Sequence, residues 1–154
     1  CMVLPGGFVV GLKDINIDDK HYVGERAAVL GSMVGKFPVP DGFIIAFPAY
    51  FEFLKHGKLD IKVKHLLGAI NYDLPESINQ VSHHIIKLIK LSDIPVHIIN
   101  PVIDAYEKMG SHRVLVETTV VTGDHNQHAF DREYKAHEVL GDASLLDVIR
   151  SSWA

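Results

Sequence analysis

Apolar residues in the first quarter of this chain recur at a spacing that predicts an amphipathic helix. They fall four, three and four positions apart within residues 23–34. The four positions are Val23, Ala27, Leu30 and Val34. This repeat is close to one helical turn, so the four side chains would form one stripe. Gly35 follows at once, as glycine often does where a helix ends. Residues 23–34 are therefore predicted to be a helix with one buried face.

Further helices are predicted from proline, glycine and capping signals. Pro48 suits the first position of a helix that Gly57 ends. The segment 59–70 is ambiguous and is assigned as helix. Asp73 and Glu76 have the spacing of a capping box. The helix that they would open buries four apolar side chains, namely Ile78, Val81, Ile85 and Leu88.

Two helices are predicted nearer the end of the chain. The dipeptide Asn100-Pro101 would start the first, and Gly110 would end it. Its predicted inward residues are Val102, Tyr106 and Met109. Asp142 would cap the second. Its predicted inward residues are Leu145, Ile149 and Trp153.

Three short runs of apolar and β-branched residues predict strands, at residues 8–12, 43–47 and 114–121. A rigid turn with two prolines, residues 38–42, precedes the second run. A polar loop at residues 122–128 follows the third. Because strands and helices mix along the chain, the expected fold class is α/β or α+β, with a mixed sheet and flanking helices.

Composition limits the classes of function. The chain has 154 residues, of which 47% are hydrophobic, so we expect residues 1–154 to form a single domain. The formal net charge is −4, which excludes a basic nucleic-acid footprint. Since no apolar run is long enough to cross a bilayer and no leader pattern is present, we expect no membrane partner. Cys1 is the only cysteine, and a cytoplasmic location is the simplest expectation.

A few local patterns bear on chemistry. The chain lacks both common glycine-rich phosphate loops and the serine elbow of hydrolases. Asp124, His125, His128 and His137 offer nitrogen and carboxylate ligands of the kind that zinc accepts. Their spacing follows no standard zinc pattern, so a solvated polar loop is the competing interpretation. We assign no metal ligands and rank a metal-binding protein last.

Three segments together resemble the N-terminal part of the ATP-binding domain of phosphoenolpyruvate synthase and pyruvate phosphate dikinase. Residues 23–31 read V-G-E-R-A-A-V-L-G and resemble the family's V-G-G-K-x-A-x-L-G. Residues 37–45 read F-P-V-P-D-G-F-I-I, similar to F-P-V-P-x-G-F-x-[IV], which is the most specific match. Residues 114–119 read V-L-V-E-T-T, in the place of V-A-V-R-S-S. The order of the three segments is that of the family.

The resemblance implies an ATP-grasp fold that binds ATP and Mg²⁺. In the family, such a domain transfers phosphate from ATP to a histidine on a separate domain, from which it passes to pyruvate. In the family, the lysine of G-G-K and the arginine of V-R-S-S contact the phosphates. Their positions here are held by Arg26 and Glu117, followed by the hydroxyls of Thr118 and Thr119. The expected nucleotide-binding residues are therefore Arg26, Glu117, Thr118 and Thr119.

The charge reversal at Glu117 changes what we expect of this site. A carboxylate beside a triphosphate repels it, and at an effective dielectric of about 20 one close pair costs on the order of several kcal/mol. We therefore expect weak or lost ATP binding, no catalytic residue in this chain, and no activity without the rest of the dikinase. The alternative function is a degenerate, non-catalytic relative that acts as an interaction module. Such a module would pair with another protein chain or form a homo-oligomer.

Overall fold

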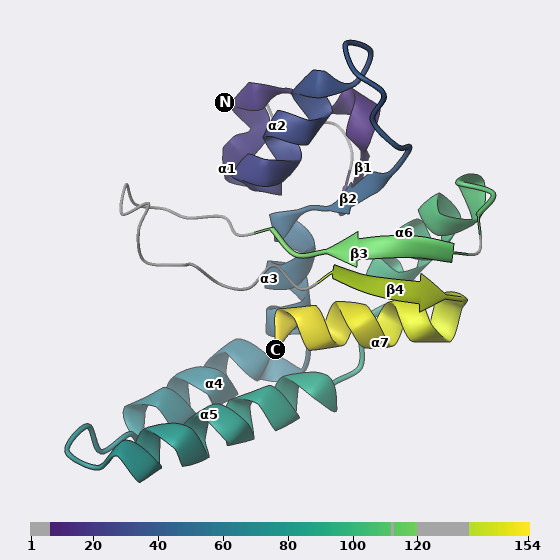
Figure 1. The fold of residues 1–154 in the computed structure, drawn as a ribbon. Coiled ribbons are helices and arrows are strands. Elements are labelled where there is room, and N and C mark those ends of the chain that lie inside the picture. Colours follow the sequence, from purple (N-terminus) through teal and green to yellow (C-terminus); the bar gives the residue numbers. More distant parts are fainter. Residues whose placement is uncertain (1–6, 112, 120–135) are drawn as a thin grey trace.

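The computed structural model describes residues 7–111, 113–119 and 136–154, and it is mixed helix and strand, as expected. Strand β1 (Val9–Gly11) pairs antiparallel with β2 (Phe43–Ile45), so that Val9 lies opposite Ile45. Between these strands the chain forms the 3-10 turns Leu12–Asp14 and Ile17–Asp19 and then helices α1 (Lys20–Val23) and α2 (Glu25–Met33). These elements make up the upper end of the molecule in Figure 1.

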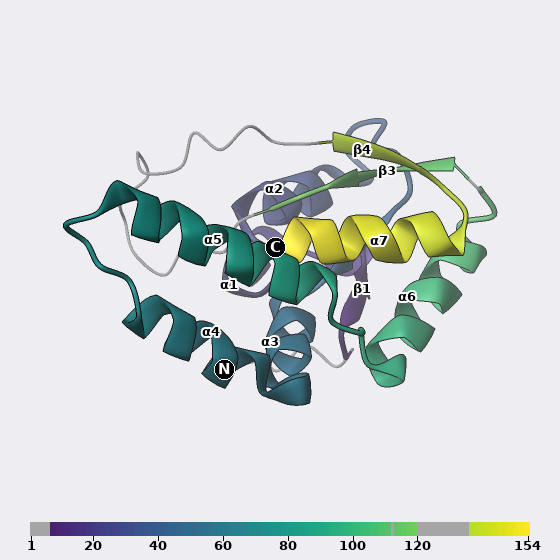
Figure 2. The ribbon, with the colours of Figure 1, turned by 90° about the horizontal axis from the view of Figure 1, so that it is seen from below.

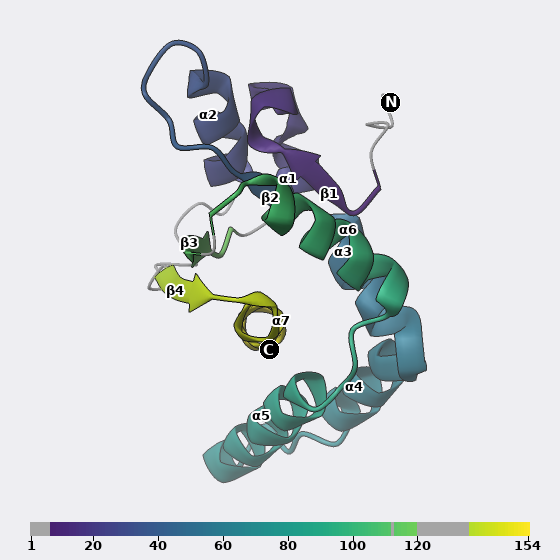
Figure 3. The ribbon, with the colours of Figure 1, turned by 90° about the vertical axis from the view of Figure 1, so that its right-hand side faces the viewer.

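A helical region follows β2. Helix α3 (Phe47–Lys55) begins one residue before Pro48, and a 3-10 turn (His56–Lys58) joins it to α4 (Leu59–Gly68). Helix α5 (Pro75–Lys90) returns beside α4, and α6 (Val96–Lys108) leads back towards the sheets. Helices α4 and α5 form an antiparallel hairpin at the end of the molecule opposite α2 (Figure 3). The ambiguous segment 59–70 is thus confirmed as helix.

The second sheet lies between these two ends. Strand β3 (Arg113–Glu117) pairs antiparallel with β4 (Ala136–Leu140), so that Glu117 lies opposite Ala136. Helix α7 (Asp142–Trp153) runs beneath this sheet and beside α5 (Figure 2). No strand was predicted at β4. The predicted strand 114–121 ends at Glu117 within the described residues, because Thr118 and Thr119 are no longer paired. The predicted loop 122–128 lies outside the described residues.

The predicted helix 23–34 is in fact two helices. Gly24 interrupts it with a φ of 89°, so α1 ends at Val23 and α2 begins at Glu25. The buried face of α2 is also smaller than predicted. It consists of Ala27, Ala28 and Gly31, whereas Leu30 is exposed. Because a Cβ on Gly31 would come within 2.8 Å of Ile15 Cβ, the contact depends on small residues, which a search for large apolar side chains overlooks.

Both predicted caps are wrong by one residue. Leu74 is the N-cap of α5 and makes no side-chain cap, so Asp73 and Glu76 form no capping box. The reason is Pro75, which fits the first helical position and moves the start of the helix beyond Asp73. Gly141 is the N-cap of α7, and Asp142 is the first helical residue. Its carboxylate there still interacts favourably with the helix dipole.

The start of α6 is the largest boundary error. The helix begins at Val96 and contains Pro101 in its interior. Proline removes the N–H that would bond to the carbonyl four residues earlier, which is why a start was predicted there. Burial outweighs this loss, because α6 buries Ile98, Val102 and Tyr106 one turn apart.

Within the described residues, the buried apolar side chains form two clusters. The larger cluster brings together helices α3, α4, α5, α6 and α7 and strand β4. Its buried residues include Phe53, Ile98 and Val139. Trp153 packs against it with its ring centroid 4.9 Å from that of Phe53. The smaller cluster joins β1, α1 and α2 and includes Val10, Val23 and Ala46. Ile78, predicted to be inward, is exposed near the tip of the α4–α5 hairpin.

Candidate functional site

The structure brings together the two charged residues on which the sequence argument depended. Arg26 lies in the first turn of α2, and Glu117 is the last residue of β3. Arg26 Nη2 lies 2.8 Å from Glu117 Oε2, so the two side chains form an ion pair. Their side chains are 50% and 37% exposed, respectively. An exposed pair of this kind contributes only about 0–1 kcal/mol to stability. It matters here because it places a negative charge next to the expected phosphate-binding cation.

The chain just after Glu117 packs against the start of α2. A Cβ added to Gly24 would overlap Oγ1 of Thr119. Thr119 therefore lies against the backbone at the junction of α1 and α2, two residues before Arg26. Thr118 and Thr119 are both partly exposed. The predicted residues Arg26, Glu117 and Thr119 thus meet at one place, formed by the start of α2 and the end of β3.

Gly24 is the residue of this place that was not singled out from the sequence. Its positive φ is unfavourable for residues with a side chain, and its lack of a Cβ makes room for Thr119. The available signals were a glycine inside the predicted helix 23–34 and its place in the motif V-G-E-R, neither of which indicates a contact with Thr119.

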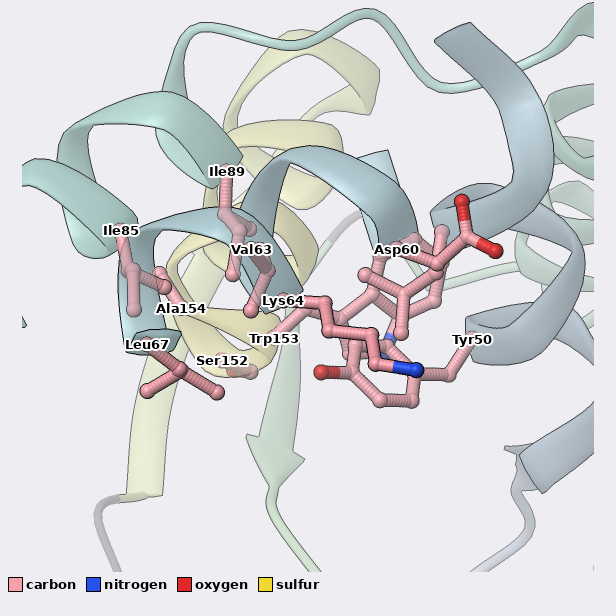
Figure 4. Close-up of a pocket in the computed structure, with 11 residues that line it drawn as sticks. Tyr50, Asp60, Val63, Lys64, Leu67, Ile85, Ile89, Ser152, Trp153 and Ala154 are labelled. Carbon is pink, nitrogen blue, oxygen red and sulfur yellow. The ribbon is translucent and has the colours of Figure 1, made fainter. Parts of the chain in front are cut away.

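A separate cavity of about 460 Å³ opens between α3, α4, α5 and α7 (Figure 4). Its walls are mainly apolar, with Leu54, Ile89 and Trp153 among them, and Tyr50 and Lys64 also line it. Burial raises the pKa of the Tyr50 phenol above its ordinary value of 10.0, because desolvation disfavours the phenolate. This cavity shares no residue with the place where Arg26 meets Glu117.

The part of the chain that the structure describes contains neither a cluster of potential metal ligands nor a membrane-spanning helix. Its His, Cys, Asp and Glu side chains nowhere gather in threes around a point where a metal ion could bind. His137 is exposed on β4, whereas Asp124, His125 and His128 lie outside the described residues. None of the described helices is both long enough and apolar enough to cross a membrane.

Residues 20–154 match the family model described as pyruvate phosphate dikinase, AMP/ATP-binding domain. The chain is also similar to phosphoenolpyruvate synthase of Aeropyrum pernix, with 26% identity over 155 residues that cover 95% of this chain and 19% of that protein. Phosphoenolpyruvate synthase of Aquifex aeolicus is 23% identical over 158 residues, covering 95% of this chain and 18% of that protein. The chain thus spans about a fifth of the length of these relatives. The resemblance inferred from the three motifs is confirmed: the chain belongs to the pyruvate phosphate dikinase AMP/ATP-binding domain family.

Proposed function

We propose that this chain is the nucleotide-binding N-terminal portion of a phosphoenolpyruvate synthase-like dikinase, inactive by itself. In this proposal residues 1–154 are one partial domain of ATP-grasp type. ATP is the phosphoryl donor, and the phosphate passes towards pyruvate through a histidine on another domain. The observation that supports the proposal best is that the start of α2 and the end of β3, which carry the two phosphate-contacting motifs, meet at one place.

Each predicted residue has a proposed role at this place. Arg26 supplies the positive charge that pairs with phosphate oxygens, and its planar guanidinium can bind two of them. Thr118 and Thr119 supply hydroxyl donors beside the same ligand. Glu117 carries the opposite charge and weakens the binding of a triphosphate. Mg²⁺ would neutralise phosphate charge in the whole enzyme, and no described residue of this chain is assigned to hold it.

Binding of a labelled ATP analogue to the purified chain tests the proposal. The unchanged chain should show no binding at micromolar concentrations, and Glu117→Arg should bind measurably, because the substitution replaces a repelling charge by a second cation. Glu138→Arg is the matched control, since Glu138 is a second ion-paired carboxylate on the same sheet. It should leave binding unchanged. Failure of Glu117→Arg to bind would contradict a surviving nucleotide site.

A second candidate function is that of a non-catalytic interaction module. It is favoured by the outer face of the β3–β4 sheet. Leu115 and Leu140 lie on the same face by their pairing register, and both are exposed. A two-stranded sheet with such a face is an unusual free surface, so pairing with a second copy would bury it.

Light scattering over a range of concentrations tests this second candidate. A module that pairs through the sheet should form dimers, and Leu115→Lys combined with Leu140→Lys should return it to monomers. A chain that stays strictly monomeric at all concentrations would count against pairing through this face.

A further inference from the structure

Glu117 is in direct contact with the cation of the proposed phosphate site. Its Oε2 lies 2.8 Å from Arg26 Nη2, which is hydrogen-bonding distance. A carboxylate presents two oxygens to a guanidinium in much the same way as a phosphate does. The carboxylate therefore holds the donor group that a phosphate ligand would use.

The fold keeps this carboxylate in place. The backbone of Glu117 is held by its pairing with Ala136 at the end of β3, and its carboxylate contacts Arg26. Two residues later, Thr119 packs against the backbone of Gly24, directly before α2. The ion pair and the Thr119–Gly24 contact thus join the end of β3 to the start of α2, while β4 holds β3 from the other side. About half of the Arg26 side chain stays exposed, so a ligand in solution can reach it.

We infer that Glu117 is an internal competitor that occupies Arg26 and thereby selects against polyphosphate ligands at this site. The inference rests on the proposed nucleotide-binding function and adds how Glu117 acts. Simple repulsion would reach the ligand through space and would act whether or not Arg26 is present. Occupancy acts only through Arg26.

A double-mutant cycle separates the two effects, with inorganic tripolyphosphate as the ligand so that only phosphate recognition is measured. The four proteins are the unchanged chain, Glu117→Gln, Arg26→Gln and the double variant. Glutamine is almost the same size as glutamate; it removes the charge and replaces one acceptor oxygen by an NH2 group. Titrations by calorimetry extend to millimolar ligand, so that the weak binding of the Arg26→Gln proteins is measured.

If Glu117 acts as a competitor, Glu117→Gln should tighten binding of tripolyphosphate about tenfold when Arg26 is present. This gain corresponds to about one hydrogen bond to a charged group, which the ligand no longer has to displace. The gain from the same substitution should be at least about threefold smaller when residue 26 is glutamine, because only through-space repulsion then remains. Glu138→Gln, which removes the other ion-paired carboxylate of the sheet, should have no effect.

Two results would overturn the inference and leave the proposed function intact. One is an equal gain from Glu117→Gln in both backgrounds, which is the signature of repulsion alone. The other is no gain from Glu117→Gln while Glu117→Arg binds tripolyphosphate. Absence of binding in every variant, Glu117→Arg included, would overturn the proposed function and the inference with it.

Discussion

At the residue scale, the contact between Gly24 and Thr119 shows how a backbone position determines the geometry of the candidate site. Gly24 has a φ of 89°, and a Cβ there would overlap the Thr119 side chain. Two separate demands, a positive φ and close packing, therefore fall on one residue. The first exists in the isolated turn, whereas the second exists only when β3 lies against α2.

Gly24→Ala should destabilise the chain by about 2–4 kcal/mol, about 1–3 of which come from its backbone conformation, with φ 89° and ψ 156°. Gly35→Ala is the matched control, because Gly35 has a φ of 80° with nothing within 4 Å of an added Cβ. It should show the φ cost alone. Urea denaturation measures both. Thr119→Ala combined with Gly24→Ala should recover part of the difference, because the Cβ of residue 119 would still lie 3.1 Å from the added Cβ. Equal costs for Gly24→Ala and Gly35→Ala would contradict the packing contact.

Tyr50 predicts a pH dependence of stability. Burial raises the pKa of its phenol above 10.0 in the folded state. As pH rises, the unfolded chain therefore loses this proton first, and the free energy of unfolding falls from about pH 10 upward through the folded pKa. Tyr50→Phe should reduce this alkaline loss, as measured by urea denaturation at neutral and alkaline pH.

The control for Tyr50 is Tyr72→Phe, since the Tyr72 side chain is 77% exposed. Its alkaline loss should equal that of the unchanged chain. An unchanged alkaline loss in Tyr50→Phe would show that the phenol has an ordinary pKa in the folded protein.

At the scale of elements, α5 shows that one apolar stripe need not be buried along its full length. The predicted stripe runs from Ile78 to Leu88, next to the buried Ile89, but α5 passes beside α7 only in its second half (Figure 2). Ile89 is 4% exposed and Ile78 is 42% exposed. The same residue type on one helix therefore has two different environments.

Ile89→Ala should cost about 2–5 kcal/mol in the free energy of unfolding, as is usual for a buried isoleucine. Ile78→Ala should cost less than about 1 kcal/mol, because little apolar area there is removed from water. Urea denaturation of the two variants compares the same substitution, isoleucine to alanine, at a buried and at an exposed position of one helix. Equal costs would mean that the hairpin tip is covered, for example by a second copy.

At the scale of the whole molecule, the two apolar clusters divide the chain. The smaller cluster holds α1 and α2 against β1, and the larger one holds α3 to α7. The candidate site lies where the start of α2 meets the end of β3 (Figure 1). Its geometry therefore depends on how the two parts are held together and not on either cluster alone.

Val23→Ala and Val102→Ala should act on different parts of the molecule. Both valines are 1% exposed, and each belongs to a different cluster. Native-state hydrogen exchange should show faster exchange in α2 for Val23→Ala, with α6 little changed, because local opening follows contiguous cooperative units. Val102→Ala should show the converse. A uniform increase across the chain in both variants would indicate a single cooperative unit.

The sequence by itself determined the kinds of element and the family. Apolar spacing is a local property, so it located the stripes of α5 and α7 and the strands β1, β2 and β3. The motifs around Arg26 and Pro38 led to the family that the comparison with residues 20–154 confirms. Element boundaries were less accurate. For example, α6 continues through Pro101 because the helix buries side chains against distant parts of the chain, which local spacing does not record.

Only the tertiary structure decided which parts of the stripes are covered, and that Arg26 pairs with Glu117 rather than merely lying near it. Exposure of Ile78 and burial of Ile89 depend on where α7 packs, which no pattern within α5 records. The ion pair joins residues far apart in the chain, and its distance is set by packing between α2 and β3. Local spacing determines which face of an element is apolar. Contacts between elements determine what that face meets.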